Sequence, residues 1–278
     1  MRLPEFLRDD VDKTPPDFNA EHIIEMTDVT FGYKSTKTIL HDISFTIDKP
    51  EFVCIVGPNG VGKSTLIKCM NGLLKPSTGI VKIYGKEVRT YALKELAKVA
   101  GYVPVKTNDF SVLSVLDTVL IGRYAHQSWK TKPEEVAMAY KALEALEMQD
   151  YAMEKFNDLS AGQYQKVSIA RGLVQEPKIL ILDEPTSNLD IRHQIYVTAF
   201  LKKLSAKTGM TIIMISHDLN LAAKFADRVI VMEAPGKIHS IGTPQEVFTE
   251  KMISEVYNVK CRVEDDGGTP HIVLQYVK

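Results

Sequence analysis

Short apolar runs mark the strands that we expect in this chain. Three of them, at Phe52–Val56, Ile179–Leu182 and Thr211–Ile215, are almost continuously apolar. The last two have the composition of strands buried on both faces of a parallel sheet. Two earlier runs, beginning at Ile23 and covering Thr38–Ile47, alternate polar and apolar residues in part, which predicts antiparallel strands at the edge of the fold.

Further elements are predicted from shorter patterns. Residues 79–84, followed by Gly85, indicate a short strand and turn, and the segment HIVLQYV near the C-terminus is strand-like. Residues 91–99 favour a helix. Pro133 opens another helix with acidic residues in its first turn, as a helix start prefers. Its predicted apolar face has helical spacing and comprises Val136, Tyr140, Leu143 and Glu147, with Leu146 beside them.

The most specific motif is GPNGVGKST at residues 57–65, directly after the first buried run. It fits the phosphate-loop pattern G-x-x-x-x-G-K-[ST]. Glycines allow successive backbone N–H groups to turn toward phosphate oxygens, and the following helix directs its positive end at the same anion. We expect Lys63 to reach the β- and γ-phosphates and Ser64 to hold Mg²⁺. The expected nucleotide contacts are Gly57, Pro58, Asn59, Gly60, Val61, Gly62, Lys63, Ser64 and Thr65.

Polar residues follow both later buried runs: Asp183-Glu184 after one and Ser216-His217-Asp218 after the other. Ligands of parallel α/β sheets bind beyond the carboxyl ends of the strands, so we expect these groups to meet the phosphate loop. Asp183 is the expected Mg²⁺ partner of Ser64, and Glu184 the general base that polarises water. The alternative for Glu184 is a local cap or salt bridge. His217 is expected at the γ-phosphate, and the alternative is a structural histidine.

Composition narrows the class of protein. The 278 residues are enough for one large or two small domains, and 45% of them are apolar, which allows a sizeable core. The formal net charge of −1 gives no support for a nucleic-acid partner. Three cysteines without metal-type spacing indicate reduced thiols in a cytosolic protein, and we place Cys54 in the core. No apolar run approaches the roughly 20 residues that span a bilayer, so a role at a membrane would be peripheral.

Together these motifs resemble the nucleotide-binding subunit of ATP-binding-cassette (ABC) transporters. LSAGQ at 159–163 is similar to the signature motif LSGGQ, and SNLD at 187–190 to the D-loop. The resemblance covers roughly residues 23–260. It implies an α/β P-loop NTPase with a mixed parallel core sheet, an antiparallel β edge subdomain and an inserted helical subdomain. It also implies that ATP contacts Tyr33 through its adenine and, from a second subunit, Ser160, Ala161, Gly162, Gln163 and Asp190. A guanine-reading N-K-x-D pattern is absent, consistent with ATP rather than GTP.

The resemblance implies partners as well as cofactors. The expected cofactors are ATP and Mg²⁺, clamped in a head-to-tail homodimer. Segments around residues 111–123, 216–232 and 242–259 resemble ATPases of importers for iron–siderophore, haem and cobalamin. Such ATPases work with integral-membrane permease subunits and, indirectly, a substrate-binding protein, on the cytoplasmic inner face of the cell membrane. The alternatives are an importer of another cargo, such as molybdate or a metal ion, a soluble ABC protein without transport, and a scaffold with a relic nucleotide site.

The expected domains follow from these assignments. An ATP-binding core with the antiparallel subdomain comprises residues 22–104 and 171–245, and a helical signature subdomain comprises 105–170. Residues 1–21 form a polar extension and 246–278 a C-terminal extension, for which packing against the domain body is the simplest interpretation.

Three positions depart from the family pattern. Val105 stands where the family has a glutamine that touches Mg²⁺ and water, and valine cannot form a side-chain hydrogen bond. Either Lys106 or Asn108 serves instead or coupling is altered. Ala161 replaces a signature glycine, a mild change where φ is negative, and Pro50 occupies a turn where glycine is common.

Overall fold

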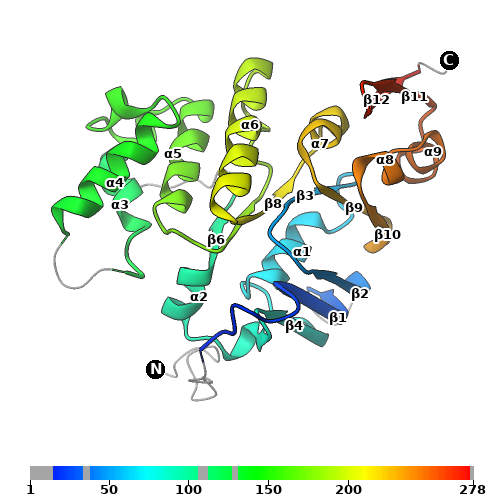
Figure 1. The fold of residues 1–278 in the computed structure, drawn as a ribbon, viewed down its shortest axis with the longest axis horizontal. Helices are drawn as coiled ribbons and strands as arrows, with labels where there is room; N and C mark the ends of the chain where they lie inside the picture. The colour runs from blue at the N-terminus through cyan, green and yellow to red at the C-terminus, as the bar shows by residue number, and fades with distance from the viewer. Residues whose placement is uncertain (1–14, 34–37, 106–111, 127–130, 276–278) are drawn as a thin grey trace. The chain divides into compact units, whose positions relative to one another are not determined.

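The computed structural model describes residues 15–33, 38–105, 112–126 and 131–275 (Figure 1). The chain divides into two compact units. Unit 1 comprises Met1–Leu96 and Asp218–Lys278, and unit 2 comprises Ala97–His217. The first boundary falls inside helix α2 (Leu93–Val99). The two compact units are not the expected domains, and the expected domain boundaries stay predictions.

One sheet of unit 1 is antiparallel, in the order β2-β1-β4-β5. Its strands are β1 (Ile24–Gly32), β2 (Thr38–Ile47), β4 (Thr78–Ile83) and β5 (Lys86–Glu87). In β1, Ile24 and Met26 are buried, and a bulge then shifts the register so that Val29 is buried next. Asp28 adopts a φ of 49° at this bulge, which keeps the apolar side chains on the covered face. The two predicted antiparallel strands are confirmed.

Unit 1 also contains the strand formed by the first buried run, together with two later strands. β3 (Phe52–Val56) is buried along its whole length, Cys54 included, and pairs in parallel with β9 (Arg228–Glu233). β9 pairs antiparallel with β10 (Lys237–Gly242), so the arrangement is mixed, as expected. The helices α1 (Lys63–Met70) and α7 (Leu219–Phe225) belong to this unit.

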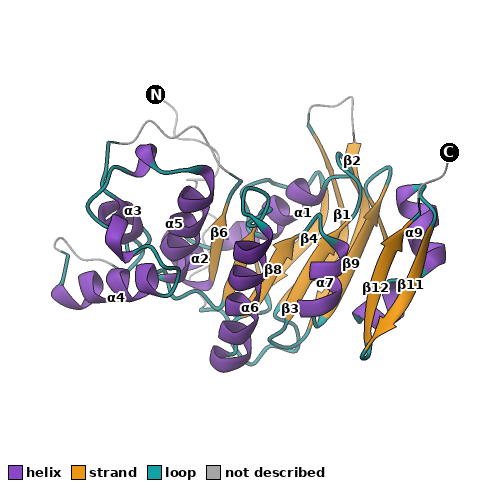
Figure 2. Ribbon diagram, turned by 90° about the horizontal axis from the view of Figure 1, so that it is seen from above, coloured by secondary structure: helices purple, strands orange, loops and turns teal. Residues whose placement is uncertain are grey.

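The C-terminal extension is well formed. It contains the end of α8 (Pro244–Val247), which begins two residues before it, then α9 (Glu250–Tyr257) and an antiparallel hairpin of β11 (Cys261–Asp266) and β12 (Thr269–Leu274). Gly267 and Gly268 form the turn with φ of 61° and 88°, the combination that a two-residue type I′ turn needs. Figure 2 shows the hairpin beside α9. The strand-like HIVL residues were predicted correctly, whereas β11, rich in charged residues, was missed.

Unit 2 combines parallel strands with a helical region. Its strands run in the order β8-β7-β6, with β6 (Ala100–Val103), β7 (Ile179–Leu182) and β8 (Thr211–Ile215). β7 and β8 are fully buried, as their composition predicts. The helices are α3 (Val115–Ile121), α4 (Pro133–Glu144), α5 (Ala161–Leu173) and α6 (Ile191–Thr208), with 3-10 turns η3 (Gln149–Tyr151) and η4 (Phe156–Asp158), besides η2 (Val88–Thr90) in unit 1.

The buried face of α4 agrees with the predicted one at Leu143 and, just after the helix, at Leu146, and differs from it elsewhere. Glu135, Ala139 and Leu143 are buried, whereas Tyr140 is 39% exposed and Glu147 lies beyond the helix end. Glu135 closes the capping box of the helix, since its Oε2 accepts from Lys132 N at 3.0 Å, and its Oε1 lies 3.8 Å from Nε of Arg123 after α3. The start of α4 at Pro133 is confirmed.

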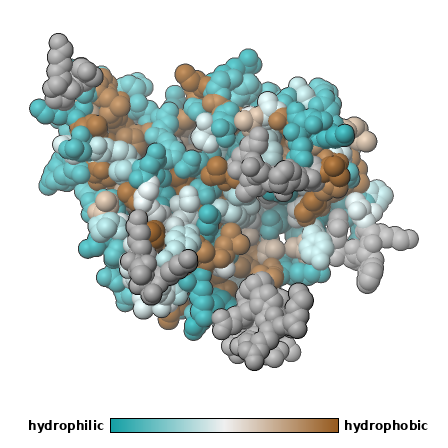
Figure 3. Space-filling model, turned by 180° about the vertical axis from the view of Figure 1, so that it is seen from behind, coloured by the Kyte–Doolittle hydropathy of each residue, from teal (hydrophilic) through white to brown (hydrophobic). Residues whose placement is uncertain are grey.

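Within the described ranges, no helix is both long and apolar enough to cross a bilayer. Figure 3 shows polar and apolar side chains interspersed on the face that it presents. The three cysteines are buried free thiols.

Candidate nucleotide site

The phosphate loop lies between β3 and α1 and depends on its glycines. Gly57 has a φ of 147°, and a Cβ there would stand 2.3 Å from the Met232 carbonyl oxygen. Gly62 is the N-cap of α1 with a φ of 102°. A side chain at either position would strain the backbone. The helix therefore begins at Lys63, as predicted, with its first N–H groups facing the loop.

The side chain of Lys63 contacts the start of its own phosphate loop. Its side chain is buried, and Nζ donates to the carbonyl oxygens of Gly57 and Pro58, both at 2.8 Å. A buried ammonium requires such partners. The charge thus lies inside the curve of the loop, beside the positive end of α1, which is the electrostatic arrangement that binds phosphate. Ser64 and Thr65 form the first turn of the helix.

Tyr33 is available as a stacking platform. It follows β1, is 51% exposed, and meets Phe31 edge to face with ring centroids 4.9 Å apart. An aromatic ring of this exposure can stack on a flat base. Its role in adenine binding remains a prediction.

Asp183 and Glu184 follow β7 in unit 2. Asp183 is 2% exposed, its N–H donates to the Val103 carbonyl at 2.9 Å, and its Oδ2 accepts from the Tyr102 hydroxyl at 3.2 Å. Glu184 has a φ of 49°, an unusual conformation for a residue with a long side chain and a frequent one at functional sites.

His217 contacts Glu184 directly. Its Nε2 lies 2.6 Å from Glu184 Oε1, and the two side chains are 40% and 25% exposed. The local salt bridge that was the alternative for Glu184 is thus present, and its partner is the histidine expected at the γ-phosphate. A carboxylate held in this way has a fixed direction and remains open to water.

The signature segment lines a pocket in unit 2. Ser160 is the N-cap of α5: its Oγ accepts from Gln163 N at 3.3 Å, and Gln163 Oε1 accepts from Ser160 N at 2.9 Å. This reciprocal capping box leaves the first turn of the helix ordered and facing the pocket. Ala161 lies in regular helix, so the replacement of glycine is tolerated there.

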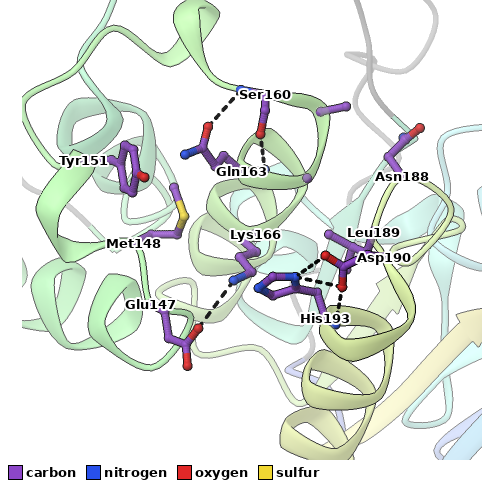
Figure 4. Close-up of a pocket in the computed structure, with 12 residues that line it drawn as sticks. Glu147, Met148, Tyr151, Ser160, Gln163, Lys166, Asn188, Leu189, Asp190 and His193 are labelled. Carbon is purple, nitrogen blue, oxygen red and sulfur yellow. Dashed lines mark hydrogen bonds and ion pairs between the residues drawn. The ribbon is translucent and has the colours of Figure 1, made fainter.

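The pocket has a volume of about 530 Å³ (Figure 4). In Figure 4, Lys166 points toward Glu147 and His193 toward Asp190, along the drawn contacts. Several residues that line the pocket were not predicted, because they come from separate segments that share no motif. The lining residues are Glu147, Met148, Tyr151, Ser160, Ala161, Gly162, Gln163, Lys166, Asn188, Leu189, Asp190 and His193.

The structure thus assembles the site in two parts. Within unit 1 it brings together the phosphate loop and Lys63, and within unit 2 it joins Glu184 to His217 and Asp190 to the signature segment. The expected meeting of Lys63 and Ser64 with Asp183, Glu184 and His217 stays a prediction. Val105 is 37% exposed after β6; Lys106 and Asn108 lie outside the described residues.

A buried strand, a glycine-rich loop and a helix that starts at the loop lysine define a P-loop nucleotide-binding protein. The family model described as ABC transporter matches residues 40–187, and the chain belongs to this family. It is an ATPase with the fold class that the sequence predicts.

Relatives extend the match over most of the chain. An uncharacterised ABC transporter ATP-binding protein of Methanocaldococcus jannaschii is 40% identical over 251 residues, which are 90% of this chain and 97% of that protein. The ferric enterobactin transport ATP-binding protein FepC of Escherichia coli is 36% identical over 88% of this chain and 91% of its own.

Solved structures of ABC transporters are also similar to this chain. An inward-facing structure assigned to the metal-chelate type of ABC transporter has a TM-score of 0.78 and 26% identity, over 92% of this chain and 98% of that one. The dimeric bacterial ABC transporter cassette MJ0796 has a TM-score of 0.73 and 31% identity, over 79% of this chain and 98% of that one.

Proposed function

We propose that this chain is the ATP-hydrolysing subunit of an importer that moves a metal chelate, such as an iron–siderophore, haem or cobalamin, through a separate permease. The observation that carries the hydrolytic part is the 2.6 Å contact between His217 and Glu184, directly after the strand that presents buried Asp183. The cargo class is supported by the names of FepC and of the metal-chelate transporter.

Mg²⁺ fits the residues proposed for it. Among the described residues, no cluster of three or more His, Cys, Asp or Glu side chains could hold a metal. Mg²⁺ bound with a nucleotide needs few protein ligands, because phosphates and waters complete its shell. The Ser64 hydroxyl and the buried carboxylate of Asp183 are the proposed ligands, and the ion would neutralise charge on the phosphates.

The proposed chemistry assigns one task to each side chain. Lys63 binds the β- and γ-phosphates from inside the loop, and Glu184 accepts a proton from the attacking water. His217 orients Glu184 and contacts the γ-phosphate. Hydrolysis and phosphate release then change the affinity between two subunits, which shifts the permease between its states.

The signature pocket supports a dimer. The capped start of α5 lies at the pocket, and the backbone N–H groups of a helix start suit the triphosphate of a second copy of the chain. The dimeric cassette among the structural relatives is consistent with this assembly. The dimer would lie on the inner face of the cell membrane, bound to permease subunits that receive cargo from a substrate-binding protein, without a role for nucleic acid.

Glu184→Gln tests the hydrolytic assignment. The amide keeps the shape of the side chain but cannot accept the proton, so we expect turnover to fall about 10²-fold or more while ATP still binds. Phosphate release and equilibrium ATP binding are measured on the same preparation. Lys63→Ala is the companion variant and should lose tight ATP binding. Normal hydrolysis by the glutamine variant would remove Glu184 from the proposal.

The cargo is tested in the native membrane. Affinity capture of the chain should recover an integral-membrane permease, and cells lacking the chain should lose uptake of one labelled chelate among ferric siderophores, haem and cobalamin. Recovery of the chain without any membrane protein would contradict the transport role.

A further inference from the structure

The hydroxyl of Tyr102 reaches the carboxylate that is proposed to hold Mg²⁺. Tyr102 lies in β6, and its hydroxyl donates at 3.2 Å to Oδ2 of Asp183, the residue directly after β7. Asp183 is only 2% exposed, whereas Tyr102 is half-buried. A buried carboxylate needs donors of this kind, because little water reaches it. The neighbouring strand therefore supplies one of the groups that hold the carboxylate in place.

The register of the two strands places these side chains together. β6 and β7 are parallel, and Tyr102 is paired with Ile181. Because alternate residues of a strand point to the same face, Asp183 shares the face of Ile181 and is a diagonal neighbour of Tyr102. The Asp183 N–H donates to the Val103 carbonyl at 2.9 Å, so the pairing of the strands continues to the aspartate. Both ends of the contact thus belong to one hydrogen-bonded ladder.

A hydroxyl that donates to a carboxylate restricts the orientation of that group. The terminal torsion of an aspartate side chain is otherwise broad, and the bond to Oδ2 favours one part of its range. The carboxylate keeps acceptor capacity for a cation, since its two oxygens offer about four lone-pair sites. Partners behind a metal ligand orient the ligand and sustain the affinity for the metal. Tyr102 has the position and the chemistry of such a partner.

We propose that Tyr102 is a positioning residue for Mg²⁺, whose hydroxyl orients the Asp183 carboxylate toward the ion that accompanies the nucleotide. This inference rests on the proposed function, in which Ser64 and Asp183 are the Mg²⁺ ligands. Tyr102 acts through the aspartate and touches neither the ion nor the nucleotide. Its contribution to nucleotide binding should therefore appear only when Mg²⁺ is present.

The expected signature is a weaker coupling between Mg²⁺ and the nucleotide. In the parent chain the ion strengthens nucleotide binding, and the nucleotide strengthens the binding of the ion by the same factor. Without the hydroxyl the carboxylate is less well oriented, so the Mg²⁺ concentration that gives half-maximal hydrolysis should rise. At saturating Mg²⁺, kcat should stay within about three-fold of the parent value, because the proposed base Glu184 is unchanged.

Tyr102→Phe in the full chain is the test, because it removes only the hydroxyl. The probe is an ATP analogue with nitrogen between its β- and γ-phosphates, which is not hydrolysed. Its Kd is measured by calorimetry, once with excess EDTA and once with saturating Mg²⁺. We expect the Kd with Mg²⁺ to rise about ten-fold, the lower end of the loss for such a partner, and the Kd in EDTA to stay within about two-fold.

Tyr91→Phe is the matched control. Tyr91 is buried, and its hydroxyl likewise donates to an oxygen of a neighbouring segment, the Ile83 carbonyl at 2.7 Å. Loss of this hydrogen bond should lower the melting temperature. Both Kd values should stay the same, because the Tyr91 hydroxyl is bonded to a backbone carbonyl and not to the proposed metal ligand.

The outcomes separate orientation of the metal ligand from general stability. If Tyr102→Phe leaves the Kd with Mg²⁺ unchanged or raises both Kd values equally, or if Tyr91→Phe gives the same pattern, the inference is wrong. Asp183→Asn distinguishes the two levels, since it should lose most of the effect of Mg²⁺. If it does so while Tyr102→Phe does not, only the role of Tyr102 fails. An undiminished effect of Mg²⁺ in Asp183→Asn would defeat the proposed metal site itself.

Discussion

At the residue scale, Asp190 shows how one neighbour can fix a carboxylate. His193 donates its backbone N–H to Asp190 Oδ1 at 2.9 Å, and its Nδ1 lies 2.9 Å from both carboxylate oxygens. These hydrogen bonds, the backbone one first, lower the pKa of Asp190. A lowered carboxyl pKa contributes stability above the unfolded value, and the contribution is lost as pH falls through the folded value.

His193→Ala should therefore raise the pKa of Asp190 toward its ordinary value without restoring it fully, because the backbone hydrogen bond survives. A carbon-detected NMR titration of the aspartate carboxyls measures this shift. His239→Ala, which removes another surface histidine beside a carboxylate, Glu255 at 3.4 Å, is the control and should leave Asp190 unchanged. An Asp190 pKa that does not move would show that the ring has no influence on it.

Val105 gives a second prediction at this scale. Its side chain is 37% exposed after β6 and can neither hydrogen-bond to water nor coordinate Mg²⁺. Val105→Gln should raise ATP hydrolysis by the isolated chain several-fold, since the family resemblance puts this side chain beside the reacting water, where a hydrogen bond is worth about 1 kcal/mol. ATP affinity should stay the same. Val112→Gln, at an 84% exposed position, is the control, and equal turnover in both variants and the parent would contradict the idea.

At the scale of elements, Arg123 fastens the helical region of unit 2. Its Nη1 donates to the Val174 carbonyl at 2.7 Å and pairs with Glu176 Oε2 at 2.7 Å, and its Nε lies 3.8 Å from Glu135 Oε1. The side chains of Arg123 and Glu135 are each only 10% exposed, whereas that of Glu176 is 56% exposed. The arginine thus connects the end of α3, the start of α4 and the end of α5.

Arg123→Met should lower the free energy of unfolding by about 3 kcal/mol, because it removes the cation beside the buried Glu135 carboxylate and the donor to the Val174 carbonyl, while the hydrogen bond from Lys132 N to Glu135 remains. Urea denaturation measures the loss. Glu176→Ala removes the exposed partner of the same arginine and should cost less than about 1 kcal/mol. Equal losses in the two variants would mean that burial does not decide the strength of this network.

Sequence patterns predicted the start of α4 correctly and its buried face in part. Pro133 with acidic residues behind it predicts the helix start, since that signal is local. The buried face was right at Leu143 and Leu146 but missed Glu135, a charged residue whose carboxylate closes the capping box and lies beside Arg123. Likewise β7 and β8 follow from their apolar composition, whereas the strand CRVEDD of β11 is held by pairing with β12 and has no apolar pattern of its own.

At the scale of the whole molecule, the residues that carry the chemistry of the site were easier to predict than the residues that surround them. The phosphate loop, Asp183-Glu184 and the signature motif each carry their function in a few adjacent residues. The contact between Glu184 and His217 follows from two strand ends of one parallel sheet. Glu147, Tyr151 and His193 come from separate segments and share only their place around the pocket. Such placement depends on the complete packing of each unit.

The proposed dimer involves two copies of the molecule, and a substitution at Gly162 in the signature pocket should block its formation. Gly162 has an ordinary backbone conformation, and a Cβ there would stand 3.2 Å from Leu189 Cδ2 and 3.5 Å from the Asn188 carbonyl oxygen. A small shift of the leucine would accommodate a side chain. Gly162→Asp therefore adds a negative charge to the signature pocket without breaking the helix.

In the Glu184→Gln background, which should retain ATP, the parent chain is expected to elute as a dimer when ATP is present. Gly162→Asp should remain a monomer, since its carboxylate would repel the triphosphate of the second copy. Its own affinity for ATP should stay within about two-fold, because the phosphate loop is unchanged. Gly162→Asn has the same shape without the charge and should dimerise at least in part. If the aspartate variant dimerises as readily as the asparagine one, the pocket does not receive a triphosphate, and the head-to-tail dimer would need another interface.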